Sequence, residues 1–212
     1  FFEYTDLVEP LSLDEAYLDV TYHKKGRPSA TLIAEEIRKR IFEETKLTAS
    51  AGVSFNKFLA KVASDVNKPN GIFVITPTEA GIFIDNLEIR RFYGIGKVTA
   101  EKFNKMGIWF GRDLKKLERL ELTRMFGKAG NYYYEISHGI DNRPVQPSRE
   151  RKSVGAEQTF STDLFYETDL NSEVLKIADI LWERVERAGV KAKTLIFKYK
   201  YADFEQHTRS KT

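Results

Sequence analysis

The chain has 212 residues, of which 42% are hydrophobic and 31% are charged, and its formal net charge at pH 7 is +3. This composition is typical of a globular protein and excludes a disordered one. No apolar run approaches the roughly 18 residues that a membrane span requires. The chain has no Cys, which excludes a disulfide framework and a thiolate zinc site. Because it begins at Phe1 without Met or a secretory leader, we expect a piece of a longer protein.

Charge is unevenly distributed along the chain. Residues 76–146 carry twelve Lys and Arg against nine Asp and Glu, whereas residues 1–75 carry ten against eleven. The middle segment is therefore the better candidate for contact with a polyanion. The acidic first segment is the better candidate for holding a metal ion.

The sequence SLDEAYLDV at 12–20 places two carboxylates, Asp14 and Glu15, between apolar runs. In one continuous strand these side chains would point to opposite faces of a sheet. A hairpin that pairs VEPLSL with AYLDV would instead place Asp-Glu at its tip, where both carboxylates can converge on one cation. Because Asp-Glu lacks the Gly or Asn that a tight turn prefers, a functional role is indicated. The alternative is a solvated acidic turn.

Strand and helix patterns alternate over residues 1–76. After a turn-rich break at 22–28, Ser29 is expected to cap a helix that continues to about residue 44, and a second helix is predicted from about Asn56 to Asn67. A buried strand of small residues is predicted at 47–53, and another strand at 72–76 follows the turn KPNG. The second helix is expected to bury Leu59, Val62, Ala63 and Val66 and to carry Lys57, Lys61 and Lys68 around its polar side. The pattern indicates an α/β or α+β layer.

Short helical segments separated by glycines are predicted from 78 to about 138. Residues 93–103 and 126–137 form a weak internal repeat of helix end, glycine turn and second helix, with Gly94 and Gly96 in the first copy and Gly127 and Gly130 in the second. Residues 141–151, which are polar and contain two prolines, are the best linker in the chain.

The last segment predicts a strand, a helix and a second strand. An alternating strand is expected at 151–160, a helix from Asn171 or Ser172 to about Ala188, and a strand at 194–201, before a polar tail. Two strands and one helix would leave much of a sheet unpaired, so this segment looks incomplete.

The sequence GIGK at 94–97 is a candidate phosphate-binding turn. Gly94 and Gly96 allow a tight turn in which backbone N–H groups at a helix start face outward, beside the positive charge of Lys97. No strand precedes the turn and the GxGxxG spacing is incomplete, so it is not a dinucleotide fingerprint. The alternative is a bare turn between two helices.

Two further features have both a functional and a structural interpretation. Lys68 in the KPNG turn could hold a triphosphate as a point charge beside an acidic metal site, or it could be an ordinary solvated lysine. The three consecutive tyrosines at 132–134 could stack on bases. Because consecutive residues of a helix point in different directions, we expect at least one of these tyrosines in the core.

Taken together, several motifs in this order resemble those of the Y-family DNA polymerases, most closely the DinB branch. They are SLDEAYLDV, TASAGVSFNKFLAKVASDVNKPNGIFVITP (48–77), YGIGKVTAEKF, GIDNRPV and RKSVG. The resemblance runs from about Phe1 to at least Ser210. It implies an α+β multidomain fold with a partial palm built on a mixed α/β sheet (1–77), an all-α helix–hairpin–helix thumb (78–143), a tether (144–150) and part of an α/β little finger (151–212).

The resemblance also implies roles for particular residues. Asp14 would bind metal and Glu15 would be catalytic, with two Mg²⁺ ions bridging the primer 3′-hydroxyl and the phosphates of the incoming dNTP. Lys68 would contact the dNTP triphosphate. The DNA-binding residues would be Gly94, Gly96 and Lys97 in the thumb and Arg151, Lys152 and Ser153 in the little finger.

The partners that the resemblance implies are primer–template DNA and dNTP, with a sliding clamp as a further candidate through regions outside this chain. It implies a cytoplasmic monomer with no membrane contact. The function would be template-directed DNA synthesis of the error-prone, translesion type. One alternative is a non-catalytic helix–hairpin–helix DNA-binding scaffold. A second is a nucleotidyl cyclase, which the thumb-like repeat and RKSVG argue against.

The sequence departs from the family pattern at both ends. The family also has an N-terminal strand with another metal-binding aspartate, aromatic residues that exclude ribonucleotides, a fingers domain and a second half of the little finger. None of these is in the 212 residues. We therefore expect the chain as given to be unable to extend a primer, and magnesium-dependent incorporation by the purified chain would contradict this expectation.

Overall fold

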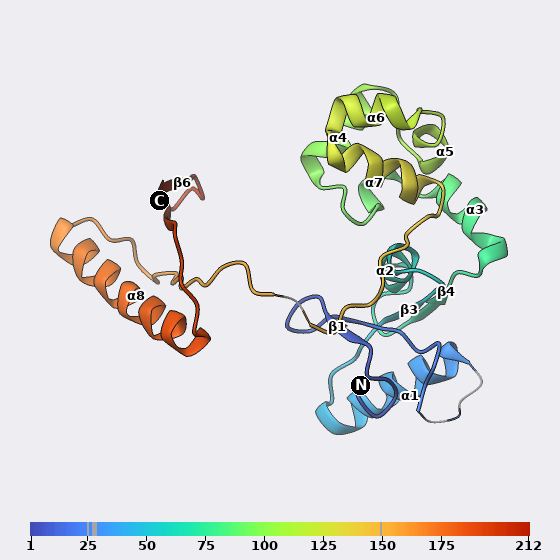
Figure 1. Cartoon of the computed structure of the whole chain (residues 1–212), viewed down its shortest axis with the longest axis horizontal. Helices are drawn as coiled ribbons and strands as arrows, with labels where there is room; N and C mark the ends of the chain where they lie inside the picture. Colours follow the sequence, from blue (N-terminus) through green and yellow to red (C-terminus); the bar gives the residue numbers. More distant parts are fainter. Residues whose placement is uncertain (25, 27–28, 149) are drawn as a thin grey trace. The chain divides into compact units, whose positions relative to one another are not determined.

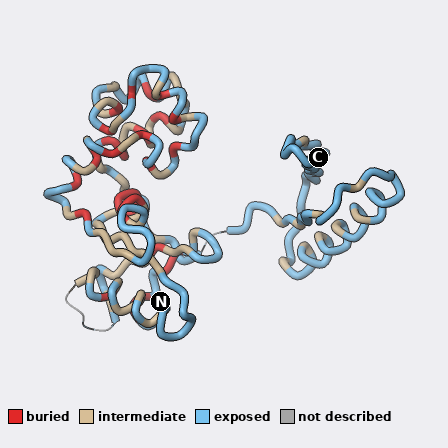
Figure 2. The backbone as a smooth tube through the Cα atoms, turned by 180° about the vertical axis from the view of Figure 1, so that it is seen from behind, coloured by how far each residue is buried: buried red, intermediate tan, exposed pale blue. Residues whose placement is uncertain are grey.

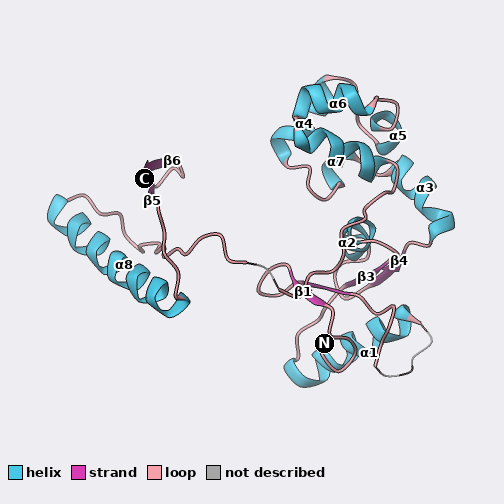
Figure 3. Ribbon diagram, viewed as in Figure 1, coloured by secondary structure: helices cyan, strands magenta, loops and turns pink. Residues whose placement is uncertain are grey.

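The computed structural model describes residues 1–24, 26, 29–148 and 150–212, which form two compact units, Phe1–Ser148 and Arg149–Thr212 (Figure 1). Part of the turn-rich break expected at 22–28, and Arg149 in the predicted linker, lie outside the described residues. The regular elements of the described residues are helices and three two-stranded sheets, which confirms the predicted mixed α+β class (Figure 3). Among the described helices, none is long and apolar enough to cross a membrane.

The acidic motif forms the predicted hairpin. Strand β1 (Val8–Pro10) pairs antiparallel with β2 (Ala16–Leu18), so that Glu9 lies opposite Tyr17. The backbone N–H groups of Leu11 and Ser12 both donate to the Glu15 carbonyl, which closes the turn. The bend therefore lies at 12–14, and Glu15 stands where the chain re-enters the strand rather than at the tip.

The structure confirms Ser29 as the predicted N-cap of the first helix. Helix α1 (Ala30–Thr45) begins after Ser29, whose side chain accepts a hydrogen bond from the Thr31 N–H, as an N-cap requires. The helix ends at Lys46, which has a left-handed backbone conformation with φ of 62°. Ile33 is the fully buried residue of this helix.

A parallel strand pair and the helix between them follow. Strand β3 (Ala51–Val53) pairs with β4 (Ile72–Val74), and α2 (Lys57–Val66) is the crossover that a parallel pair needs. The expected buried strand at 47–53 is shorter and only half-buried. Two further expectations for α2 are wrong: Val66 is 38% exposed, and Lys57 is buried rather than on the polar side.

The middle of the chain is helical, as predicted. Its elements are α3 (Pro77–Asn86), the short 3-10 helix η1 (Ile89–Arg91), α4 (Lys97–Lys105), α5 (Gly111–Leu114), α6 (Arg119–Phe126) and α7 (Lys128–Ser137). These helices share one hydrophobic core with α2. Figure 2 shows buried residues along α2 and along the middle helices. Of the three tyrosines, Tyr133 is in this core, as expected for at least one of them.

The second copy of the predicted repeat differs from the first. Gly127 separates α6 directly from α7, whereas Gly130 lies inside α7. A Cβ built on Gly130 would lie 2.0 Å from the Leu122 carbonyl oxygen, so this glycine permits the close packing of α6 on α7. It is a packing glycine and not a turn residue.

The second unit holds helix α8 (Glu167–Ala188) and an antiparallel pair, β5 (Leu195–Lys200) with β6 (Gln206–Lys211). Three expectations for it are wrong. Helix α8 begins before Asn171, with Glu167 and Asp169 in its first turn, where acidic side chains favour a helix N-terminus. The polar tail forms β6, because backbone pairing with β5 does not require apolar side chains. Residues 151–160 are irregular, because no described strand pairs with them.

Candidate functional site

Asp14 lies at the exposed bend of the β1–β2 hairpin. The Ser12 hydroxyl donates a hydrogen bond to its Oδ1 at 2.6 Å, and its own N–H donates to the Ser12 Oγ. This local turn fixes the position of the carboxylate while leaving it in contact with solvent. A fixed, solvated carboxylate is a suitable ligand for a hard cation.

Glu15 connects the hairpin to helix α2 and to the KPNG turn. Its Oε1 pairs with Lys61 Nζ at 2.9 Å, and Lys61 lies 3.7 Å from Asp65, one helical turn further on. Asp65 in turn pairs with Lys68 Nζ at 2.5 Å. The Asp65 hydrogen bond raises the pKa of Lys68 above its usual range, and the negative charges of Glu15 and Asp14 act in the same direction. We call Asp14, Glu15, Lys61, Asp65 and Lys68 the acid–lysine cluster.

The glycine turn at 94–96 joins η1 to α4. Gly94 has φ of +94°, a conformation that a side chain would strain, and a Cβ there would lie 2.8 Å from the Tyr132 ring. Ile95 is buried and anchors the turn, and α4 begins at Lys97, which is exposed. The first N–H groups of a helix have no intrahelical acceptor, so this end can bind an anion.

The remaining predicted residues lie in the second unit. Arg151, Lys152 and Ser153 are all exposed and irregular. The structure therefore brings Asp14, Glu15 and Lys68 together, as predicted, and gathers Gly94, Gly96 and Lys97 at one turn. The roles of all these residues in binding metal, nucleotide or DNA stay predictions.

Three family models match successive parts of the chain. The impB/mucB/samB family matches residues 1–65, its helix–hairpin–helix motif matches 79–108, and its C-terminal domain matches 151–212. The chain belongs to the impB/mucB/samB family.

Relatives that are about half identical to this chain over the matched residues support this assignment. The chain is 54% identical to DNA polymerase IV 2 of Agrobacterium fabrum and 52% identical to DNA polymerase IV of Leptospira interrogans, and each match covers all of this chain and 59% of the relative. Two solved structures, a Y-family DNA polymerase chimera and DinB from Sulfolobus solfataricus, match with TM-scores of 0.79 and 0.60. Both are 30% identical, with 96% of this chain and 59% of each structure covered. The chain thus spans about three fifths of the length of these proteins.

The sequence does not predict two members of the acid–lysine cluster as site residues. The sequence predicts Lys61 on the polar side of α2 and assigns no role to Asp65. Lys61, Asp65 and Lys68 follow one another at intervals of four and three residues, which places them along one side of a helix and the turn after it. That spacing is a signal that sequence reasoning could have used.

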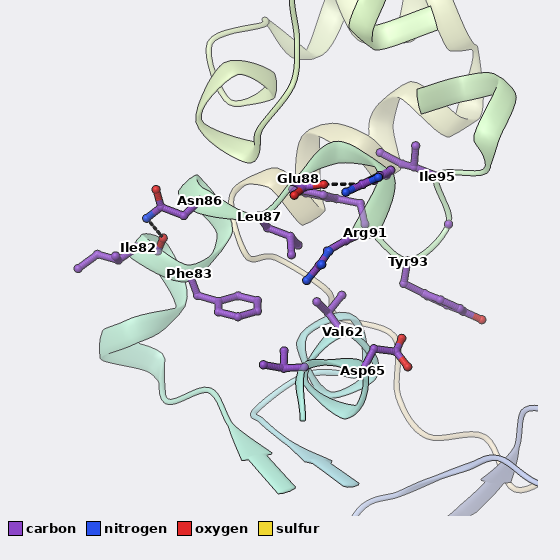
Figure 4. Close-up of a pocket in the computed structure, with 14 residues that line it drawn as sticks. Val62, Asp65, Ile82, Phe83, Asn86, Leu87, Glu88, Arg91, Tyr93 and Ile95 are labelled. Carbon is purple, nitrogen blue, oxygen red and sulfur yellow. Dashed lines mark hydrogen bonds and ion pairs between the residues drawn. The ribbon is translucent and has the colours of Figure 1, made fainter. Parts of the chain in front are cut away.

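A hollow of about 920 Å³ extends from Asp65 of the acid–lysine cluster to the glycine turn. Val62 and Asp65 of α2 line one side, while α3, η1 and residues 93–95 line the other. In Figure 4, Arg91 of η1 points toward Val62 of α2. Asp65 of the acid–lysine cluster and Gly94 of the glycine turn therefore border one hollow within the first unit.

Proposed function

We propose that this chain is part of a translesion DNA polymerase that transfers a nucleotide from dNTP to a primer 3′-hydroxyl. In this proposal residues 1–77 are palm, 78–143 thumb, 144–150 tether and 151–212 little finger. The observation that carries it is the acid–lysine cluster, where two adjacent carboxylates on a hairpin lie beside two lysines in the same unit as the glycine turn. Membership of the impB/mucB/samB family and the DNA polymerase IV relatives support it.

The donor set of the cluster suits magnesium. Mg²⁺ in proteins is commonly held by one or two carboxylates together with substrate phosphates, rather than by a cage of protein ligands. Asp14 would be the principal ligand, because its carboxylate is exposed and positioned by Ser12. Glu15 would join it by exchanging the Lys61 ammonium for the cation. When bound, two magnesium ions would neutralise the phosphates and activate the primer hydroxyl.

The lysines of the cluster would bind the nucleotide. The Lys68 ammonium is protonated at neutral pH, as lysine ordinarily is, and its hydrogen bond with Asp65 raises its pKa further. Its positive charge can attract a triphosphate. Lys68 pairs with Asp65, and Lys61 pairs with Glu15. Nucleotide binding would replace these internal ion pairs with contacts to phosphate oxygens.

Metal binding tests the role of Asp14. We expect Asp14→Asn to weaken Mn²⁺ binding to the 212-residue chain at least about tenfold, a loss seen even when only an outer partner of a metal ligand is removed. Titration calorimetry or the Mn²⁺ paramagnetic resonance signal would measure it. Asp6→Asn is the matched control, since Asp6 is also an exposed carboxylate and pairs with Lys24. Equal affinities in both variants would favour the non-catalytic scaffold, in which the acidic hairpin is only structural.

Duplex DNA binding tests the proposed backbone contacts. We expect sequence-independent binding that weakens with salt, and the double variant Lys97→Gln/Arg151→Gln should reduce the slope of log K against log[salt] by about 2, because each lost phosphate contact contributes about 0.9. Fluorescence anisotropy of a labelled duplex at several salt concentrations would measure the slope. The double variant Lys39→Gln/Lys176→Gln removes the same charge from other exposed positions. A slope unchanged by the first variant, or reduced equally by both, would count against the assigned contacts.

A further inference from the structure

Residues 139–146, which we call the exit segment, contact three other parts of the first unit. The sequence predicts a linker from residue 141 onward, and the segment contains no helix or strand beyond the end of α7. Its polar groups nevertheless contact the start of α2, strand β1 and Tyr132 of α7. An irregular segment held at several points has a fixed path, unlike a free linker.

The contacts with α2 lie at the N-terminus of that helix. The Asn56 side-chain amide donates to the Gly139 carbonyl at 2.9 Å, and the Phe58 N–H donates to Asp141 Oδ2 at 2.8 Å. Asp141 thus satisfies one of the backbone N–H groups that a helix start leaves unpaired. Its side chain is only 2% exposed, so the carboxylate is an internal part of the fold.

The contact with β1 is made through a buried ion pair. Glu9 is fully buried, and its Oε2 accepts hydrogen bonds from Lys57 Nζ at 2.5 Å and from the Gln146 N–H at 2.8 Å. Lys57 Nζ also donates to the Pro144 carbonyl at 3.2 Å. The strand that leads into the acidic hairpin, the start of α2 and the exit segment therefore meet at one polar centre.

The contact with the glycine turn passes through Arg143 and Tyr132. Arg143 donates two hydrogen bonds to Asp141, at 2.7 and 2.8 Å, and its guanidinium lies 5.1 Å from the centre of the Tyr132 ring. The Tyr132 hydroxyl donates to the Tyr93 carbonyl at 3.1 Å, immediately before the glycine turn. Burial alone would raise the pKa of Asp141, but its bonds with Arg143 and the backbone N–H groups bring that pKa below its usual range. The carboxylate is therefore charged at neutral pH.

We propose that the exit segment is a strap that sets the position of the glycine turn relative to the acid–lysine cluster, with Asp141 and Arg143 as positioning residues. This inference rests on the proposed function only for the roles of the two sites, which are DNA binding at the glycine turn and metal and nucleotide binding at the acid–lysine cluster. The path runs from α2, which carries Lys61 and Asp65, through Asp141, Arg143 and Tyr132 to the Tyr93 carbonyl. A DNA backbone gripped at the turn would thereby be held at a fixed place with respect to the carboxylates.

Amide hydrogen exchange tests the strap without DNA. The Ile95 N–H donates to the Phe92 carbonyl and reports opening of the glycine turn. In Asp141→Asn, the Phe58 N–H keeps an oxygen acceptor while Arg143 loses its counter-charge. We expect Ile95 exchange to become about fivefold faster, as the loss of one hydrogen bond of typical net strength would give. Tyr132→Phe, which keeps the ring but removes the bond to Tyr93, should give a similar increase.

Arg119→Gln is the matched control. Arg119 also lies over a tyrosine of α7, at 4.6 Å from the Tyr134 ring, and it pairs with Glu135 rather than with the exit segment. Its removal should leave Ile95 exchange unchanged. Equal acceleration at Ile95 and at Leu122 of α6 in Asp141→Asn would indicate general destabilisation and overturn the proposal. So would an unchanged rate at Ile95 in Asp141→Asn and Tyr132→Phe.

Duplex affinity separates this proposal from the proposed function. If the wild-type chain binds a labelled duplex, Asp141→Asn should weaken binding severalfold although Asp141 is buried and cannot touch DNA. An unchanged affinity despite a loosened turn would overturn the positional role of the strap. If the wild-type chain binds no duplex, the proposed DNA contacts fail, while the exchange rates still decide whether the strap holds the turn.

Discussion

Glu9→Gln is expected to lower the free energy of unfolding of the first unit by about 3–5 kcal/mol, because it leaves a buried ammonium without its counter-charge. The Lys57 side chain is 8% exposed and the Glu9 side chain is fully buried. Lys57 also lies 5.0 Å from the centre of the Tyr17 ring, so little water can replace the lost carboxylate. The amide would retain the volume of the side chain and a hydrogen-bond acceptor, which isolates the effect of charge.

Denaturant unfolding would measure this loss. Trp109 lies in the first unit and Trp182 in α8 of the second, so a Trp182→Phe background assigns tryptophan fluorescence to the first unit alone. Glu43→Gln is the control, since it breaks an exposed pair with Lys39 and should cost no more than about 0.5 kcal/mol. A loss in Glu9→Gln no larger than in this control would contradict the importance of the buried pair.

A double variant separates the cost of an unpaired charge from the value of the pair itself. In Glu9→Leu/Lys57→Met neither charge of this pair remains, and replacing a buried ion pair by apolar residues is often neutral or stabilising. We expect recovery of more than half of the stability lost in Glu9→Gln. The recovery should be incomplete, because the Gln146 N–H and the Pro144 carbonyl lose their side-chain partners.

Gly130→Ala should destabilise the first unit by about 3 kcal/mol, at the upper end of the range for overpacking. The added Cβ would lie 2.0 Å from the Leu122 carbonyl oxygen and 2.3 Å from its carbonyl carbon, and backbone atoms cannot move aside as a flexible side chain can. Helices α6 and α7 would have to separate. Thermal and denaturant unfolding of the purified variant would measure the effect.

Gly81→Ala is the control for this substitution. Gly81 also lies inside a helix, α3, but a Cβ there would have no heavy atom within 4 Å. Since alanine favours a helix interior over glycine, this variant should be more stable by about 0.5–1 kcal/mol. A loss of stability at both positions would show that helix propensity and packing have been assigned wrongly here.

Features defined by neighbouring residues could be predicted from the sequence. The pairing of VEP with AYL, the Ser29 cap of α1 and the turn at GIGK depend on side-chain alternation, on a hydroxyl at a helix start and on glycine at a positive φ. Motif order was also sufficient to indicate the family to which the chain belongs. The hairpin, the cap and the turn each involve residues within about ten positions of each other, so local interactions decide them.

What only the tertiary structure decided concerns residues far apart in the chain. Lys57 has the pattern of a solvated helix residue, yet Glu9, 48 positions earlier, makes it a buried ion partner. The exit segment has the composition of a linker, yet Asp141 and Gln146 hold it against α2 and β1. Residues 151–160 alternate like a strand, but no described strand pairs with them. The polar tail becomes β6 because it pairs with β5. A side chain's burial and a strand's existence depend on what packs beside it, and local sequence does not specify that neighbour.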